Sequence, residues 1–91
     1  MDSGKPYIDI ETTNNYTIRE FDESIDPIEL MWHRDNEDRL IEAIEPTDWK
    51  IQLDNELPIC FSKGKIFIRK HVWHRAIKGT GKLKLKIHKN V

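Results

Sequence analysis

Hydrophobic and polar residues alternate with a period of two along most of the chain, whereas apolar stripes at helical spacing are scarce. The clearest case is segment 82–87, in which every second residue is lysine and the residues between are leucine or isoleucine. One face of such a strand is expected to be buried while the other carries ammonium groups. Bounded by turn residues, the pattern predicts strands at 7–11, 16–21, 28–33, 39–45, 49–53, 59–61, 65–68, 71–77 and 82–87.

Segment 39–45 is the one place where a helix competes with a strand. Leu40, Ile41 and Ile44 also fit the apolar stripe of a short helix. A length of seven residues between two turn signals favours a strand. Short strands at regular spacing, without helices, predict an all-β fold: a small antiparallel barrel or sandwich.

The size and composition of the chain are those of one small domain. Its 91 residues are too few for two hydrophobic cores. Hydrophobic residues make up 37% and charged residues 34%, with a mean hydropathy of -0.69, so the core must be small. The apolar residues nevertheless suffice for a globular unit, because they include three tryptophans and many isoleucines and leucines.

The net charge of -1 averages two opposite halves. Residues 1–45 hold 13 acidic and 4 basic side chains, and residues 46–91 hold 3 acidic and 11 basic ones. Such halves can pair with each other as neighbouring strands, within one chain or across a dimer, as readily as the basic half can attract nucleic acid. We expect the first kind of pairing, and nucleic acid is disfavoured as a partner.

The sequence also predicts the compartment. No apolar run approaches the roughly 20 residues that cross a bilayer as a helix, and residues 1–4 have neither the basic nor the apolar region of a signal peptide. A soluble, cytoplasmic protein without a membrane partner is expected. The single cysteine, Cys60, cannot form an intramolecular disulfide and lies in an apolar stretch, so we expect a small buried hydrophobe.

The candidate chemistry lies in two Trp-His-Arg triplets on separate predicted strands, 32–34 and 73–75. Alternation places His33 and Asp35 on one face of their strand and Trp32 and Arg34 on the other. Together with His74, this face carries the donors of a two-histidine, one-carboxylate metal site, which leaves coordination positions open. The alternative is a pair of ordinary half-buried histidines, one of them held by the carboxylate.

Around these residues the sequence resembles the cupins, the jelly-roll family that includes RmlC-like proteins. Their first motif has a His-x-His pair followed by a glutamate, and matching it to His33 puts Asp35 at the second histidine and Arg39 at the glutamate. Their second motif ends in a histidine that matches His74. Segments 43–45 and 66–68 look like further pieces of the pattern, and small cupin-like proteins of marine tailed phages look similar as well.

The resemblance implies a single cupin-like domain over 1–91, a double-stranded β-helix. Residues 27–91 would form the core with the motifs, and residues 1–26 an N-terminal hairpin that could serve as a dimer arm. By family habit and because so small a core is marginal alone, a homodimer is expected. If the chain is phage-encoded, its compartment would be the host cytoplasm.

Arg39 decides how the implied metal site is interpreted. A guanidinium aimed at the ion position disfavours a cation there. It could instead pair with Asp35, which gives a metal-free cup for a small anionic or sugar-like ligand, lined by His33, Asp35, Arg39 and His74. Tryptophans could provide a stacking wall if they face inward.

If Arg39 points outward, one divalent ion (iron, manganese, nickel or zinc) could bind to His33, Asp35 and His74. The leading hypothesis is a small-ligand-binding or non-catalytic protein. The alternative is a metal-dependent oxygenase, isomerase or sugar-modifying enzyme.

Overall fold

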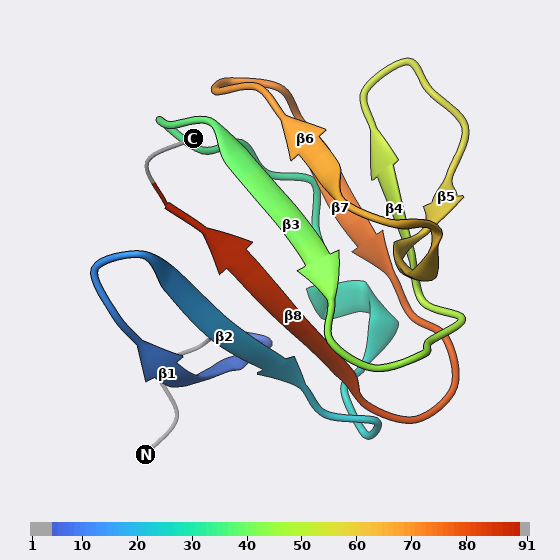
Figure 1. Cartoon of the computed structure of the whole chain (residues 1–91). Helices are drawn as coiled ribbons and strands as arrows, with labels where there is room; N and C mark the ends of the chain where they lie inside the picture. The colour runs from blue at the N-terminus through green and yellow to red at the C-terminus, as the bar shows by residue number, and fades with distance from the viewer. Residues whose placement is uncertain (1–4, 90–91) are drawn as a thin grey trace.

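Two antiparallel sheets make up the computed structural model, which describes residues 5–89 (Figure 1). The larger sheet has the strand order β1-β2-β8-β3-β6 and the smaller one β5-β4-β7, so the predicted all-β class is confirmed. Within residues 5–89, no helix is long and apolar enough to cross a membrane. In chain order the elements are β1 (Ile8–Thr12), β2 (Tyr16–Phe21), the 3-10 helix η1 (Pro27–Glu29), β3 (Arg39–Ala43), β4 (Lys50–Leu53), β5 (Ile59–Cys60), the 3-10 helix η2 (Phe61–Lys63), β6 (Ile66–Ile68), β7 (His74–Ile77) and β8 (Leu83–His88).

The core lies on the inner side of β8, which runs between β2 and β3 (Figure 1). Leu83, Leu85 and Ile87 are all buried, as the alternating pattern predicts. Opposite them pack buried residues of both sheets, among them the fully buried Trp49, whose indole N–H donates to the backbone oxygen of Gly81. The two sheets therefore share one hydrophobic core.

The outer side of β8 joins the basic half of the sequence to the acidic half. Lys84 pairs in register with Glu20 of β2, and Lys86 with Glu42 of β3. The ammonium of Lys86 also lies 4.5 Å from the ring centroid of Tyr16. Two lysines of the basic half therefore lie beside two glutamates of the acidic half on neighbouring strands of one chain.

Segment 28–33 is not the strand that its alternating pattern predicts. Pro27 sits in the first turn of η1, and the Asp26 carboxylate caps that turn by accepting a hydrogen bond from the N–H of Ile28. Proline at this place and aspartate before it both favour a helical turn, and these local bonds outweigh the alternation. Extended pairing is limited to an isolated bridge at His33.

Segment 71–77 is also extended over a shorter stretch than predicted. His71 has a φ of 69°, a left-handed conformation that ends extended structure, and β7 begins only at His74. Other strand ends differ from the prediction by one or two residues. Segment 39–45, where a helix competed, is a strand over its first five residues. Cys60 is half-buried rather than buried, and its thiol donates to the backbone oxygen of Thr47.

β1 forms an edge of the larger sheet, and all five of its residues are exposed. Two of them, Ile8 and Ile10, are large hydrophobic residues with exposed fractions of 66% and 50%. An apolar edge of this kind is suited to pairing with another strand. The homodimer that the sequence analysis anticipates stays a prediction.

Candidate functional site

The structure brings His33, Asp35 and His74 together. One potential ligand atom from each side chain lies within 4.8 Å of the other two. An ion bound about 2.1 Å from each donor holds donors about 3 to 3.5 Å apart, so the cluster is close to the spacing that an ion requires. His74 is buried, Asp35 is half-buried and His33 is exposed, so the cluster reaches from the core to the surface.

A backbone bridge creates this proximity. The N–H of His33 donates to the carbonyl oxygen of His74 at 2.9 Å, and the N–H of His74 donates back to His33 at 2.8 Å. Directly opposed antiparallel residues project their side chains to the same face of the sheet. The two imidazole rings therefore meet edge to face, with centroids 4.3 Å apart.

Both histidines are oriented by the backbone. The Nδ1 atom of His33 lies 3.1 Å from the carbonyl oxygen of Met31, and that of His74 lies 2.8 Å from the carbonyl oxygen of Val72. A carbonyl oxygen can only accept, so each Nδ1 carries the proton. In the neutral ring, Nε2 then has a free lone pair. Fixing the tautomer in this way is how outer partners prepare metal-binding histidines.

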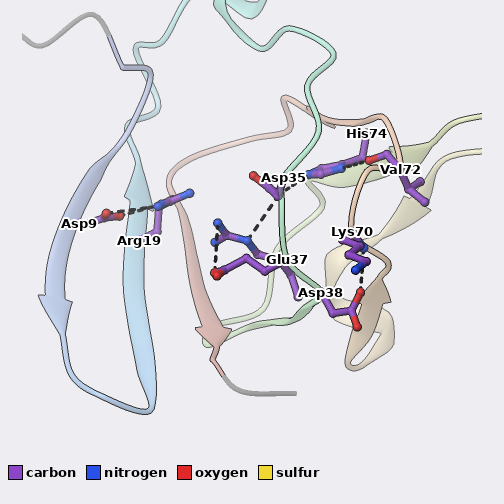
Figure 2. Close-up of polar contacts among 9 residues, drawn as sticks. Asp9, Arg19, Asp35, Glu37, Asp38, Lys70, Val72 and His74 are labelled. Atoms are coloured by element: carbon purple, nitrogen blue, oxygen red, sulfur yellow. Dashed lines mark hydrogen bonds and ion pairs between the residues drawn. The ribbon is translucent and has the colours of Figure 1, made fainter.

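Asp35 lies between a histidine and an arginine. Its Oδ2 atom is 3.3 Å from Nε2 of His74, which Figure 2 shows as a dashed contact, and 3.5 Å from Nε of Arg39. The adjacent His74, the charge of Arg39 and a weaker effect of His33 lower the pKa of this carboxyl, although partial burial opposes them. Asp35 is therefore a carboxylate at neutral pH and can act as an anionic donor.

Two contacts from the loop before β7 hold the segment that carries Asp35. The N–H of His71 donates to the backbone oxygen of Asp35, and the N–H of Lys70 donates to the Asp38 carboxylate, each at 2.8 Å. Figure 2 shows the Lys70 contact beside the cluster. These bonds connect the two parts of the chain that supply the histidines, and thereby fix the carboxylate relative to His74.

Arg39, at the start of β3, extends toward the cluster. The sequence left two orientations open, and the structure has Arg39 facing Asp35. Its Nε atom is buried but has no hydrogen-bond acceptor among the described residues, because 3.5 Å is too long for a good bond. Its only other ionic contact there is with the exposed Glu37, at 4.0 Å from Nη2.

His33 and Asp35 line a pocket of about 380 Å³, and His74 lines the smaller cavity next to it. This inner cavity of about 50 Å³ continues toward the core and shares His33, Asp35 and Arg39 with the pocket. Three cationic and two anionic side chains line the outer pocket, alongside mainly apolar residues. The lining residues of the outer pocket are Lys5, Pro6, Tyr7, Arg19, Phe21, Glu29, Leu30, Met31, His33, Asp35, Arg39 and Ala76.

Two features of this region were not foreseen. Arg19, at the pocket wall, donates to both carboxylate oxygens of Asp9 (Figure 2). Its guanidinium carbon also lies 3.8 Å from the ring centroid of Tyr7. In the sequence, the only sign of this contact was that Asp9 and Arg19 lie in neighbouring alternating strands of a predicted hairpin. On the outer side, each arginine of the triplets lies over the tryptophan of the other triplet, so no tryptophan forms a wall of this pocket.

The comparisons with known proteins identify the fold. No protein-family model and no curated protein sequence matches the chain. Among solved structures, a cupin-2 domain containing protein from Shewanella frigidimarina is similar over 98% of this chain and 83% of its own, with 19% identity and a TM-score of 0.63. KdgF from Halomonas sp. is similar over 97% and 82%, with 15% identity and a TM-score of 0.62.

A third similar structure is hydroxypropylphosphonic acid epoxidase from S. wedmorenis, at 19% identity and a TM-score of 0.60. This match covers 80% of the chain but 41% of the epoxidase, so the chain spans about two fifths of that protein. At sequence identities this low, the similarity shows a shared fold and does not show a shared function. The chain has the cupin fold, a small antiparallel β-barrel.

Proposed function

We propose that this cupin-fold protein binds one divalent transition-metal ion through His33, Asp35 and His74, and presents it to a small ligand in the adjoining pocket. Imidazole nitrogens with one carboxylate are a donor set suited to iron, manganese, nickel or zinc. A structure similar to this chain over 97% of its length is described as FeII HppE, at 14% identity and a TM-score of 0.59. That description supports the capacity of the fold to hold iron(II), while the proposal itself rests on the residues of this chain.

The contact between His74 and Asp35 carries the proposal. The Nδ1 proton of His74 is engaged by Val72, so in the neutral ring Nε2 presents a lone pair to a carboxylate oxygen 3.3 Å away. Two acceptors facing each other in a buried place repel. A cation resolves this, either as a second proton on His74 or as a metal ion that both atoms bind. His33, with its Nε2 also free, adds a third donor that a proton alone does not require.

The bound ion would act as a Lewis acid with open coordination positions. The residues of the chain have separate tasks around it. Asp35 supplies negative charge, and buried His74 supplies a rigid nitrogen because its Nδ1 is tied to the backbone.

The metal-free cup is the second candidate, and the position of Arg39 favours it. The guanidinium faces Asp35 and can balance its charge without an ion. In that case the cup would bind a small ligand by hydrogen bonds and charge alone. The two candidates differ in one measurable property, which is the metal content of the protein.

Elemental analysis of protein purified without chelator decides between them. We expect close to one equivalent of a transition metal in wild type, and its loss in His33→Ala and His74→Ala. His88→Ala is the matched control, because His88 also faces a carboxylate but lies outside the cluster. Far-ultraviolet circular dichroism verifies that each variant is folded. A metal-free wild type that also fails to bind added Zn²⁺ or Fe²⁺ would overturn the proposal in favour of the metal-free cup.

A further inference from the structure

Arg39 is a charged group whose donors are unused. Its side chain is 24% exposed, and none of its N–H groups donates a hydrogen bond to residues 5–89. A guanidinium has five N–H donors in a planar fork. One of them, on the buried Nε, has no acceptor among the described residues, and a buried donor left in this state is unfavourable. The 3.5 Å contact with Asp35 supplies charge balance but no well-formed hydrogen bond.

Of the other arginines around the pocket and on the triplets, Arg19 and Arg75 have hydrogen-bond acceptors, and Arg34 is exposed to solvent. Arg19 uses Nε and Nη2 on the Asp9 carboxylate, and Arg75 uses the same two atoms on the side-chain oxygen of Gln52. Arg34 lies over the ring of Trp73 at 5.1 Å, on the side away from the pocket. Arg39 is therefore the arginine of this region with capacity for a new acceptor, and it lines both the outer pocket and the inner cavity.

We propose that Arg39 binds the oxyanion group of a small ligand, a carboxylate or a phosphoryl group, next to the cluster of His33, Asp35 and His74. Planar oxyanions accept two parallel bonds from a guanidinium fork, which a hydroxyl or an amide cannot match. The inner cavity of about 50 Å³ has room only for one or two atoms of the size of water. The bulk of the ligand therefore lies in the outer pocket, against Tyr7 and Leu30.

With the metal ion of the proposed function bound, the charges beside Arg39 would attract an anion. Without an ion, Arg39 and Asp35 cancel, and the cluster offers little net attraction. A divalent ion makes the same group of charges net positive, so anion binding and metal binding should strengthen each other. The placement beside an ion rests on the proposed function, whereas the need of Arg39 for an acceptor does not.

Calorimetric titration with pyruvate and with inorganic phosphate tests the assignment, on Zn²⁺-treated and on chelator-treated protein. Pyruvamide, which lacks the charge of pyruvate, is the probe control. We expect Arg39→Gln to weaken binding of the preferred anion about 10- to 100-fold, the range for a lost charge-assisted fork. Arg39→Lys keeps the charge but loses the fork and should fall in between. Arg34→Gln, on the outward side of the same segment, should leave binding unchanged.

The outcomes separate the two proposals. Preference for pyruvate identifies a carboxylate ligand, and preference for phosphate a phosphoryl one; either supports the assignment when Arg39→Gln abolishes the preference. Equal affinity of wild type and Arg39→Gln for the preferred anion overturns it, as does a wild type that binds neither anion in either metal state. Where pyruvate is the preferred anion, equal affinity for pyruvate and pyruvamide also overturns it. If the anion binds through Arg39 in protein that never takes up metal, the inference stands and the proposed metal function fails. If the protein binds metal but no anion binding depends on Arg39, the proposed metal function stands and the inference about Arg39 fails.

Discussion

Two histidine–carboxylate pairs in this molecule use the same groups in different ways. His74 and Asp35 face each other at 3.3 Å in the lining of the inner cavity, and their side chains are 5% and 23% exposed. His88 of β8 and Glu42 of β3 meet at 2.6 Å on the larger sheet, with exposures of 23% and 31%. In each pair the histidine lowers the pKa of the carboxyl.

The second ring nitrogen distinguishes the pairs. Nε2 of His88 is free to carry the proton and donates to Glu42, so this pair is complete at short distance. His74 has its proton engaged at Nδ1 by Val72, which leaves its contact with Asp35 incomplete unless a cation is added. In this chain, the pair whose histidine already has its other nitrogen engaged by the backbone is the one that is left open to a cation.

The largest effect expected from this comparison is stabilisation by metal. A ligand that binds only the folded state at 100 times its dissociation constant adds about 2.7 kcal/mol to the free energy of unfolding. For a chain of this size that raises the melting temperature by roughly 10 °C or more. We expect added Zn²⁺ to have this effect on wild type and His88→Ala, and to leave His74→Ala unchanged. Thermal melts followed by circular dichroism measure it.

If Zn²⁺ stabilises His74→Ala as much as wild type, the incomplete pair is not the binding site. If His88→Ala instead loses the stabilisation, the complete pair binds the ion, and the distinction between the two pairs is wrong. Magnesium serves as a control ion, because it prefers oxygen donors and should not stabilise a site rich in imidazole.

The sequence was sufficient for the parts of this picture that depend on alternation. Period-two patterning predicted β2, β4 and β8 and placed His33 and Asp35 on one face, whereas β3 was predicted from the length of its segment between two turn signals. It could not show that His33 and His74 would form a bridge, because pairing between strands depends on the whole topology. Segment 28–31 was assigned wrongly because one capped turn outweighs the pattern there.

The hydrogen bonding of Arg39 could not be predicted from the sequence, for a different reason. Spacing predicted that Arg39 could meet Asp35, and the structure has the two in contact. Whether the contact satisfies the guanidinium depends on a few tenths of an ångström, which backbone packing sets and residue types do not encode. The roles given to these residues stay predictions until metal and ligand binding are measured.

A smaller effect is expected on the stability of the metal-free protein. Removing the His74 ring leaves a gap in a largely enclosed place and breaks its bond to Val72, so His74→Ala should lower the free energy of unfolding by about 2 kcal/mol. His88→Ala removes a partly exposed pair and should cost less than about 1 kcal/mol. Urea denaturation in the presence of chelator measures both, and equal losses would contradict the difference in enclosure between the two pairs.

The smallest effect concerns the pH dependence of the complete pair. The hydrogen bond from His88 lowers the pKa of Glu42 below its ordinary value of 4.5, with smaller help from nearby lysines. Ionised Glu42 therefore stabilises the fold above that value, and this contribution disappears as the pH falls through the lowered pKa. The stability difference between wild type and Glu42→Gln should be constant from about pH 5 to 6 and should shrink as the pH falls through the lowered pKa of Glu42.

Urea denaturation of both proteins across this pH range measures that difference. Glu45→Gln removes an equal charge from an exposed residue just beyond β3, and should show no comparable change with pH. Because the pair is partly open to solvent, 1 M salt should reduce the effect of Glu42→Gln. A stability difference that persists unchanged at pH 3 would show that Glu42 contributes by packing. The ion pair between Glu42 and His88 would then not contribute to stability.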